Sequence, residues 1–249
     1  LIHALPIFHV HGLFVALHGA LINGSKMIWL SKFDPKRVLE KMRHATVFMG
    51  VPTLYVRLLA EPGLTKEAVS NMRLFVAGSA PLLIETFTEW QQKTGLTILE
   101  RYVMSETIML TSNPYDTKQG ERRGMTVGFP LPGVRLRVQD DAGHTLPVGE
   151  IGGIQVKGPN VFQGYWHMPD KTAEEFTSDG FFKTGDVGRV DAQGRRRRGV
   201  RGSGLEQSSP AQDDLVLSGS ILARMGDEQT RPFCSARHRR QEAAMRQVP

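Results

Sequence analysis

Four segments of the chain carry side chains whose types and spacing could bind a nucleotide, a metal ion or an acid. One of these segments, at residues 100–106, follows a short apolar run that is typical of a buried strand. In it, Tyr102 could stack on a base, Ser105 could hydrogen-bond a phosphate, and Glu106 could hold Mg²⁺ through its oxygen atoms. A sheet edge with a solvated glutamate would carry the same residues, so both interpretations stay open at this point.

Two other segments follow apolar residues and combine small residues with hydrogen-bonding side chains. Gly78 and Ser79 come after the apolar run at 73–77, where small residues let a backbone approach a flat ligand and the serine can hydrogen-bond it. Asp186 follows a glycine, and a carboxylate in that place can accept hydrogen bonds from both hydroxyls of a ribose. A strand-to-helix turn and a capping aspartate are the structural alternatives.

The remaining segment, at residues 5–13, contains His9 and His11. Two residues apart on a strand, these side chains would share one face and could suggest a metal-binding pair. A zinc site needs further ligands at suitable spacing, and none follows. The segment is therefore interpreted as a partly buried pocket wall.

Residues 1–113 show the alternating periodicity of helices and strands that could position these segments. Apolar spacing and turn residues predict helices over 34–44, from 52 onward and over 81–93, and buried strands over 46–49, 73–77 and 97–99. Asp34 followed by proline is typical of a helix start, and Gly95 of a helix end. Such alternation with short connections predicts an α/β subdomain with a mostly parallel sheet.

Residues 114–194 have a different texture. Glycine and proline recur every few residues, and the segments at 134–139 and 150–157 alternate apolar and polar side chains. This pattern predicts a small β-rich subdomain with a short helix near 171–176.

Composition is typical of a globular protein, with 40% hydrophobic and 22% charged residues among 249. No apolar run approaches the roughly 18 residues of a membrane span, so no membrane partner is expected. The single cysteine, Cys234, excludes an internal disulfide and a thiolate metal cage. Leu1 and the residues after it lack the basic start of a signal peptide, so we expect a fragment of a cytoplasmic protein.

Nearly all of the formal net charge of +6 comes from the last 55 residues, 195–249, which we call the tail. Residues 1–194 hold 20 basic and 19 acidic side chains, whereas residues 195–249 hold 11 arginines, six acidic residues and no lysine. The four arginines at 195–198 have no interleaved aromatic residues, so no nucleic-acid partner is expected. We expect the tail, 195–249, to be disordered, with a short helix possible at 215–225.

In their order along the chain, the four segments resemble the adenylate-forming acyl-CoA synthetases, a superfamily shared with luciferases and peptide-synthetase adenylation domains. Residues 182–186 resemble its Y/F-x-T-G-D motif, residues 100–106 its Y-G-x-T-E motif, and residues 78–81 its G-x-x-P strand end. The resemblance covers residues 1–194. It is closest to the malonyl-CoA synthetases, through residues 6–12, 51–53, 111–115 and 127–133.

This resemblance implies a ligase that uses ATP, Mg²⁺ and CoA. A carboxylate, malonate in the closest branch, attacks the α-phosphate of ATP to give an acyl-adenylate, and CoA then displaces AMP. The fold implied is a partial N-terminal domain of an adenylate-forming enzyme. The nucleotide-binding residues implied are Gly78, Ser79, Ala80, Pro81, Glu100, Arg101, Tyr102 and Asp186, with the glycine-to-proline turn and Tyr102 around the adenine and Asp186 on the ribose.

The resemblance also implies catalytic and substrate-binding roles. Ser105 would contact the α-phosphate, Glu106 would bind Mg²⁺, and His9 would gate the acyl pocket beside Ser79. The second carboxylate of malonate needs a cation, and the malonyl-specific branch implies an arginine on the helix after Val-Pro-Thr, where Arg57 lies. A solvated surface arginine is the alternative.

The sequence departs from the family pattern in three places. The phosphate loop that precedes the Phe-His motif in the family is absent here, and Val103 stands where the family has glycine, so its side chain would crowd a nucleotide. After Gly194 the expected hinge motif and catalytic lysine give way to arginine-rich sequence, which suggests a shifted reading frame. We therefore expect weak or absent catalysis, and a nucleotide-binding remnant without chemistry is the alternative function.

Overall fold

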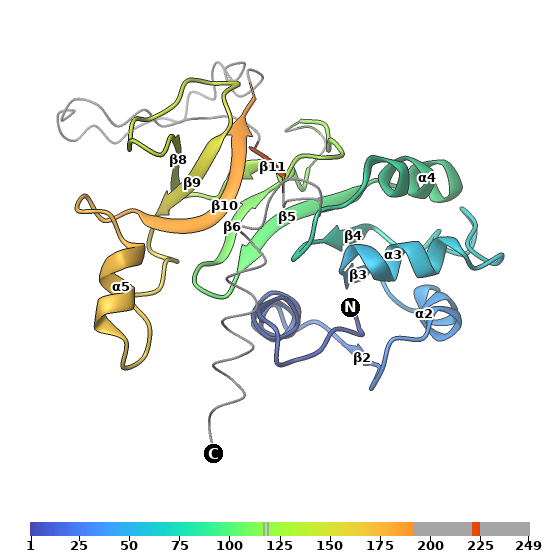
Figure 1. Ribbon diagram of the computed structural model, residues 1–249. Coiled ribbons are helices and arrows are strands. Elements are labelled where there is room, and N and C mark those ends of the chain that lie inside the picture. Colours follow the sequence, from blue (N-terminus) through green and yellow to red (C-terminus); the bar gives the residue numbers. More distant parts are fainter. Residues whose placement is uncertain (117, 119, 192–220, 225–249) are drawn as a thin grey trace, which may run out of the picture.

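The protein is described by a computed structural model that covers residues 1–116, 118, 120–191 and 221–224. Its main sheet has seven strands: β1 (Ile2–His3), β2 (Ile28–Trp29), β3 (Val47–Gly50), β4 (Leu74–Ala77), β5 (Ile98–Met104), β6 (Ile108–Ser112) and β7 (Phe129–Pro130). Their order is β2-β1-β3-β4-β5-β6-β7 (Figure 1). Strands β1 to β5 pair in parallel, and β6 and β7 are antiparallel. The predicted α/β fold with a mostly parallel sheet is confirmed.

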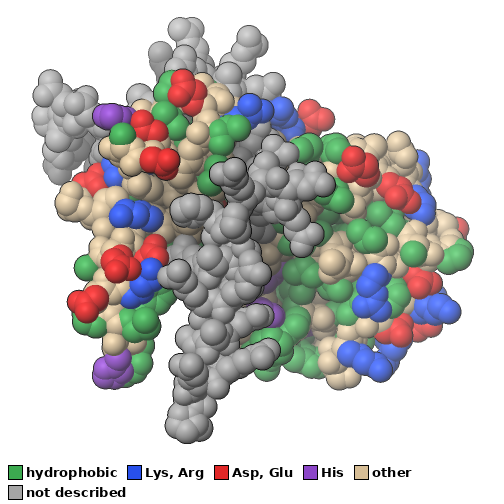
Figure 2. All heavy atoms as spheres, viewed as in Figure 1, with side chains coloured by type: hydrophobic (Ala, Val, Ile, Leu, Met, Phe, Trp, Pro, Cys, Tyr) green, Lys and Arg blue, Asp and Glu red, His purple; other side chains and the backbone are tan. Residues whose placement is uncertain are grey.

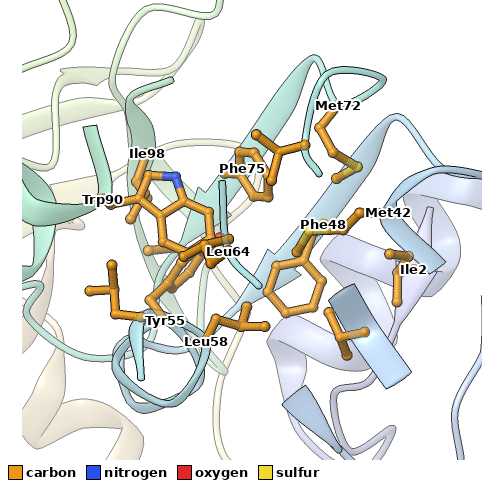
Figure 3. Packing of buried hydrophobic residues seen from close by; sticks show 14 of the residues in the cluster. Ile2, Met42, Phe48, Tyr55, Leu58, Leu64, Met72, Phe75, Trp90 and Ile98 are labelled. Carbon is orange, nitrogen blue, oxygen red and sulfur yellow. The ribbon is translucent and has the colours of Figure 1, made fainter. Parts of the chain in front are cut away.

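Three helices share one hydrophobic core with this sheet: α2 (Pro35–Met42), α3 (Pro52–Leu59) and α4 (Ile84–Thr94). The indole of Trp90 lies near Ile98 and Tyr55 in that core and is fully buried (Figure 3). Tyr55 and Phe75 pack edge-on against it, with ring centroids 5.0 and 4.8 Å away. Burial of large aromatic side chains contributes several kcal/mol each, on the order of 2–3. This core fixes the strands whose ends carry the motif segments.

The helix ends follow the turn chemistry of the sequence. The Asp34 carboxylate accepts a hydrogen bond from the Arg37 backbone N–H at 2.9 Å and caps α2. Gly95 ends α4 in the left-handed region, with φ +75°. Helix α4 begins at Ile84, later than predicted, because Leu83 before it is still extended.

Between β1 and β2 the chain forms a π-helix, η1 (His11–Leu17), which is followed by helix α1 (His18–Ile22). Element η1 contacts β1 and β6. Its neighbourhood keeps hydrophobic side chains exposed, among them Phe8 at 81% and Ile22 at 84%, and hydrophobic surface is visible over this part in Figure 2. Within the described residues, η1 and α1 are thus a layer packed on one side only.

A second, antiparallel sheet has the order β11-β10-β9-β8, with strands β8 (Arg135–Gln139), β9 (Gly152–Lys157), β10 (Phe182–Val190) and β11 (Ile221–Arg224). Helix α5 (Pro169–Glu175) lies beside it, close to its predicted place (Figure 1). Buried Leu136, Ile154 and Phe182 of this sheet pack in one cluster with Tyr102 and Leu110 of the main sheet. The predicted β-rich second part is confirmed, and its core is shared with the main sheet.

Strand β7 pairs with β6, so residues 129–130 belong to the main sheet. The helix predicted over 215–225 is wrong for residues 221–224, which form β11 because their backbone pairs with the edge of β10. The rest of the tail, for which disorder was predicted, lies outside the described residues.

The helices of the described residues are short, the longest being α4 with 11 residues. None of them is long and apolar enough to cross a membrane.

Candidate active site

Two of the motif segments meet at one edge of the main sheet because β4 and β5 are adjacent and parallel. The turn at 78–81 follows β4, and Ser105 and Glu106 follow β5. In open parallel sheets, ligands bind at the carboxyl ends of the strands. The topology therefore places these segments at the edge where a ligand is expected.

Tyr102 connects this edge to the second sheet. Its side chain is 7% exposed and donates a hydrogen bond from Oη to Asp186 Oδ2, across 84 residues of sequence. The Asp186 backbone N–H donates to Thr184 Oγ1 at 3.1 Å, and the Thr184 hydroxyl donates to the Ile154 carbonyl at 2.9 Å. Burial and the Asp186 carboxylate raise the pKa of Tyr102 well above its usual value, so its phenol remains a donor. Tyr102, which the resemblance assigns to the adenine, and Asp186, which it assigns to the ribose, are thus joined by a hydrogen bond.

The turn after β4 is tightly packed against β5 and η1. A Cβ atom at Gly78 would lie 3.2 Å from the Arg101 carbonyl oxygen and 3.4 Å from Val103 Cγ2. Ser79 has φ +68°, which is uncommon for a residue other than glycine and marks local strain. The Ser79 hydroxyl lies 3.4 Å from His11 Nδ1. Val103 is buried and occupies the space beside Gly78.

The structure corrects the predicted geometry of the histidine pair. His9 is exposed, and His11 begins η1 with its ring buried, so the two do not share one face of a strand. Burial and the nearby positive charge of Arg101 lower the pKa of His11 to about 4, so this ring is neutral at pH 7. His11, rather than His9, contacts Ser79. In the described part of the chain, no group of three His, Cys, Asp or Glu residues is placed to hold a metal.

Arg101 is a mostly buried cation close to this histidine. Its Nη1 donates to Met109 Sδ at 3.4 Å, and its buried Nε has no hydrogen-bond partner among the described residues. Burial, with repulsion from Arg122, lowers the pKa of the guanidinium. Buried charges are usually paired, so an anion is the expected complement here. We call Ser79, His11 and Arg101 the Ser79 cluster.

Glu100 has its backbone beside Arg101, but its side chain points to the other face of β5 because strand residues alternate. Glu100 is 5% exposed, and its carboxyl faces the backbone N–H groups of Met125 and Leu82, although its Oε1 atom has no hydrogen-bond partner among the described residues. Burial raises its pKa to about 8, so it is largely protonated at pH 7. Glu100 therefore contacts the backbone of Leu82, directly after the turn that follows β4.

Glu106 lies at the tip of the β5–β6 hairpin. Met104 pairs with Ile108, so Ser105, Glu106 and Thr107 form the loop, and Ile108 closes it with φ +57°. Three-residue hairpin loops commonly end on a left-handed residue, but a β-branched one is strained there. Glu106 Oε1 accepts a hydrogen bond from Tyr165 Oη at 2.9 Å.

Glu106 and Ser105 provide the kind of donors that Mg²⁺ prefers. This ion is commonly held by one or two carboxylates together with substrate phosphates. One carboxylate beside a hydroxyl at a strand end fits such an ion when a nucleotide supplies the remaining oxygen atoms.

Arg57 lies on the exposed side of α3, with its guanidinium 4.6 Å above the ring of Phe33. This is a cation–π contact. The structure thus places Arg57 against Phe33, and places Arg101 next to His11.

An open pocket of about 590 Å³ is found away from the strand ends, lined by residues 163–167 and by α5 with its flanking residues. Tyr165 lines it, and the same side chain bonds Glu106. The segment 164–166 matches the family pattern in sequence, but that match assigned Tyr165 no role and predicted neither contact.

Comparisons with known proteins decide the family. The family model for the AMP-binding enzyme matches residues 1–166. The chain belongs to the AMP-binding enzyme family. Over 213 residues this AMP-binding chain is 40% identical to a malonate–CoA ligase from Arabidopsis thaliana, and over 223 residues it is 35% identical to the mitochondrial malonate–CoA ligase from Homo sapiens. These matches cover 78% and 75% of the chain, but 34% and 38% of the relatives, so the chain spans about a third of their length.

Solved structures support the same relationship. The ATP-bound MatB from Rhodopseudomonas palustris is 58% identical, with a TM-score of 0.75 over 77% of this AMP-binding chain and 38% of that one. A malonyl-CoA ligase with methylmalonyl-CoA and AMP bound is 41% identical, with a TM-score of 0.70 over 77% of this chain and 42% of that one. The resemblance to malonyl-CoA synthetases that the motifs predict is confirmed.

Proposed function

We propose that this chain forms the nucleotide and acyl surfaces of an ATP-dependent acid–CoA ligase for a malonate-type dicarboxylate. A substrate carboxylate oxygen attacks the α-phosphorus, and pyrophosphate leaves. The sulfur of CoA then attacks the acyl carbon, its proton is released, and AMP leaves. The Tyr102–Asp186 hydrogen bond carries this proposal, because it joins two distant motifs at the carboxyl edge of the sheet.

On the nucleotide side, the protein side chains hold ATP in position and do not themselves react. Asp186, oriented by Tyr102, accepts hydrogen bonds from the ribose hydroxyls, and the turn at 78–81 lies along the adenine. Ser105 donates to the α-phosphate, and Glu106 holds Mg²⁺. When bound, Mg²⁺ offsets the negative charge of the phosphates during the displacement. Holding the two reactants in line contributes much of the acceleration in such reactions.

On the acyl side, we assign the second carboxylate of the substrate to Arg101 of the Ser79 cluster. A guanidinium can bind a carboxylate through two parallel hydrogen bonds. The Arg101 guanidinium contacts the Met109 sulfur, and its buried Nε has no hydrogen-bond partner among the described residues. The Ser79 hydroxyl and the neutral His11 ring can complete the hydrogen bonds. Arg57 is the competing candidate, but it is exposed and stacks on Phe33. His9, also exposed, keeps its proposed role as a gate at the pocket mouth.

Binding of AMP to the purified chain tests the nucleotide assignment. Calorimetry is expected to show AMP binding that weakens on the order of 100-fold in Asp186→Asn, because charge-assisted hydrogen bonds contribute about 1.5–3 kcal/mol each. Asp179→Asn changes an exposed aspartate that lies in the turn before β10 and pairs with Arg137. It is the matched control and should bind AMP normally. Equal affinity in Asp186→Asn and the control would contradict the assignment.

A thioester assay with malonate, ATP and CoA tests the chemistry. Production of malonyl-CoA that depends on all three substrates supports the ligase. AMP binding without any thioester would instead favour a nucleotide-binding remnant.

A further inference from the structure

We propose that Tyr165 is a positioning residue that orients the Glu106 carboxylate toward the cation accompanying the nucleotide phosphates. The inference rests on the proposed function, since it concerns the residue assigned to Mg²⁺. The Tyr165 phenol donates to Glu106 Oε1 at 2.9 Å, across 59 residues of sequence. Both residues lie outside helices and strands: Glu106 is in the loop between β5 and β6, and Tyr165 precedes α5.

The backbone of Glu106 is held by the same segment. The Phe162 N–H donates to the Glu106 carbonyl oxygen at 2.7 Å. The Asn160 side-chain amide donates to the carbonyl oxygens of Thr107 and Met109 at 2.8 and 3.0 Å. Residues 160–165 therefore fasten the hairpin tip in its strained conformation from one side.

The position of Tyr165 is itself determined by packing and by a side-chain cap. Its ring lies 4.8 Å from the Phe162 ring in an edge-on arrangement, and Phe162 in turn packs on Phe182 at the start of β10. Its backbone N–H donates to Thr172 Oγ1 at 2.9 Å, in helix α5. The phenol is thus supported by both β10 and α5, and Phe182 belongs to the same strand as Asp186.

A hydrogen bond from a hydroxyl to one carboxylate oxygen restricts the rotation of the carboxylate and so fixes the direction of its second oxygen. A cation site with a single protein carboxylate depends strongly on that orientation, since no second carboxylate can compensate. Hydrogen bonds to metal-binding side chains commonly change metal affinity by about 10- to 100-fold. We therefore assign Oε1 of Glu106 to Tyr165 and Oε2 to the cation.

The experiment compares metal-dependent and metal-free nucleotide binding in the 249-residue chain. Mn²⁺ is titrated in the presence of ATP and followed by electron paramagnetic resonance, and AMP binding is measured by calorimetry in EDTA. Tyr165→Phe should raise the Mn²⁺ concentration for half-saturation about tenfold, while the AMP affinity stays within about twofold. Tyr115→Phe removes an exposed phenol that accepts a hydrogen bond from Arg73, and it should change neither value.

Glu106→Gln separates the two levels of the proposal. Loss of metal dependence in Glu106→Gln but not in Tyr165→Phe would overturn the positioning role and leave the assignment of Glu106 intact. Unchanged metal dependence in Glu106→Gln, or its absence in the wild-type chain, would overturn both. An equal fall of AMP affinity and metal affinity in Tyr165→Phe would show a general packing role, and would also overturn the inference.

Discussion

The two sides of the candidate site differ in how their polar groups are satisfied. On the nucleotide side, Tyr102, Asp186 and Thr184 form a chain of hydrogen bonds that is complete down to the Ile154 carbonyl. On the acyl side, His11 Nε2 and Arg101 Nε are buried atoms without a hydrogen-bond partner among the described residues. Buried polar groups are normally paired, so unpaired ones require an explanation.

This difference suggests that the two sides contribute differently to folding and to binding. The nucleotide side is organised before any ligand arrives, and its hydrogen bonds stabilise the junction between the sheets. The acyl side retains a destabilising charge that an anionic ligand would neutralise. Such a trade of stability for function is common at binding sites.

The largest expected effect comes from Glu100, beneath the turn between the two sides. Its pKa is about 8 in the folded protein and near 4.5 when unfolded, so the folded state holds an extra proton between these values. The contribution of Glu100 to the free energy of unfolding should therefore fall as pH rises from 4.5 to 8, by up to about 1.4 kcal/mol per pH unit. Urea unfolding should show a flatter pH profile in Glu100→Gln than in the wild type. Glu121→Gln, at an exposed position, should leave the profile unchanged.

His11 should give the opposite slope at lower pH. Its pKa is about 4 in the folded protein and near 6.5 when unfolded, so the unfolded state binds the extra proton between these values. The contribution of His11 to stability should thus be lost as pH falls from 6.5 to 4, with a slope of up to about 1.4 kcal/mol per pH unit, opposite in sign to that of Glu100. His11→Gln should reduce that loss, whereas the exposed His44→Gln should not. Identical profiles for both variants would contradict the buried, neutral ring.

Two substitutions should change stability in opposite directions. Tyr102→Phe removes the donor to Asp186 and should lower the free energy of unfolding by about 1–3 kcal/mol. Arg101→Met removes a poorly paired buried charge at similar volume and should raise it by about 1 kcal/mol. Urea unfolding at pH 7 measures both. A loss of stability in both variants would remove the contrast between the two sides.

Val103→Gly tests the space beside Gly78 and should have the smallest effect on binding. The substitution removes the Cγ2 atom that lies 3.4 Å from the Cβ position of Gly78. AMP affinity should improve a few-fold, while stability falls by about 2–4 kcal/mol through the lost side chain and the added chain freedom. Weaker AMP binding at a temperature well below the melting point would show that Val103 does not crowd the nucleotide.

Local chemistry in the sequence predicted much of the fold. Asp34-Pro35 and Gly95 mark helix ends that the structure confirms, and the apolar runs at β3 and β4 were found from periodicity. Strand β5 is longer than its predicted core because Glu100 and Arg101 interrupt the apolar run. Tertiary packing buries Glu100 and partly buries Arg101, which a charged residue in a sequence does not signal.

The candidate site was predictable as a set of motifs but not as a set of contacts. Motif order pointed to Tyr102 and Asp186, although not to the hydrogen bond between them. Spacing suggested that His9 and His11 share one face of a strand, because the π-helix that begins at His11 has no clear sequence signature, and only the resemblance singled out His9. The contact of Tyr165 with Glu106 and the packing around Arg101 involve residues far apart in sequence, so they become evident only in the folded structure. The assigned roles themselves stay predictions until they are measured.

Discrimination between two adenylate mimics tests the central claim most directly. Calorimetry would compare the non-hydrolysable sulfamates of malonyl-adenosine and acetyl-adenosine on the wild-type chain, Arg101→Gln and Arg57→Gln. We predict that the wild type binds the malonyl mimic at least tenfold more tightly, since a charge-assisted carboxylate pair contributes about 1.5–3 kcal/mol. The preference should be lost in Arg101→Gln and retained in Arg57→Gln. Equal binding of both mimics by the wild type, or loss of the preference in Arg57→Gln alone, would contradict the assignment of the second carboxylate to Arg101.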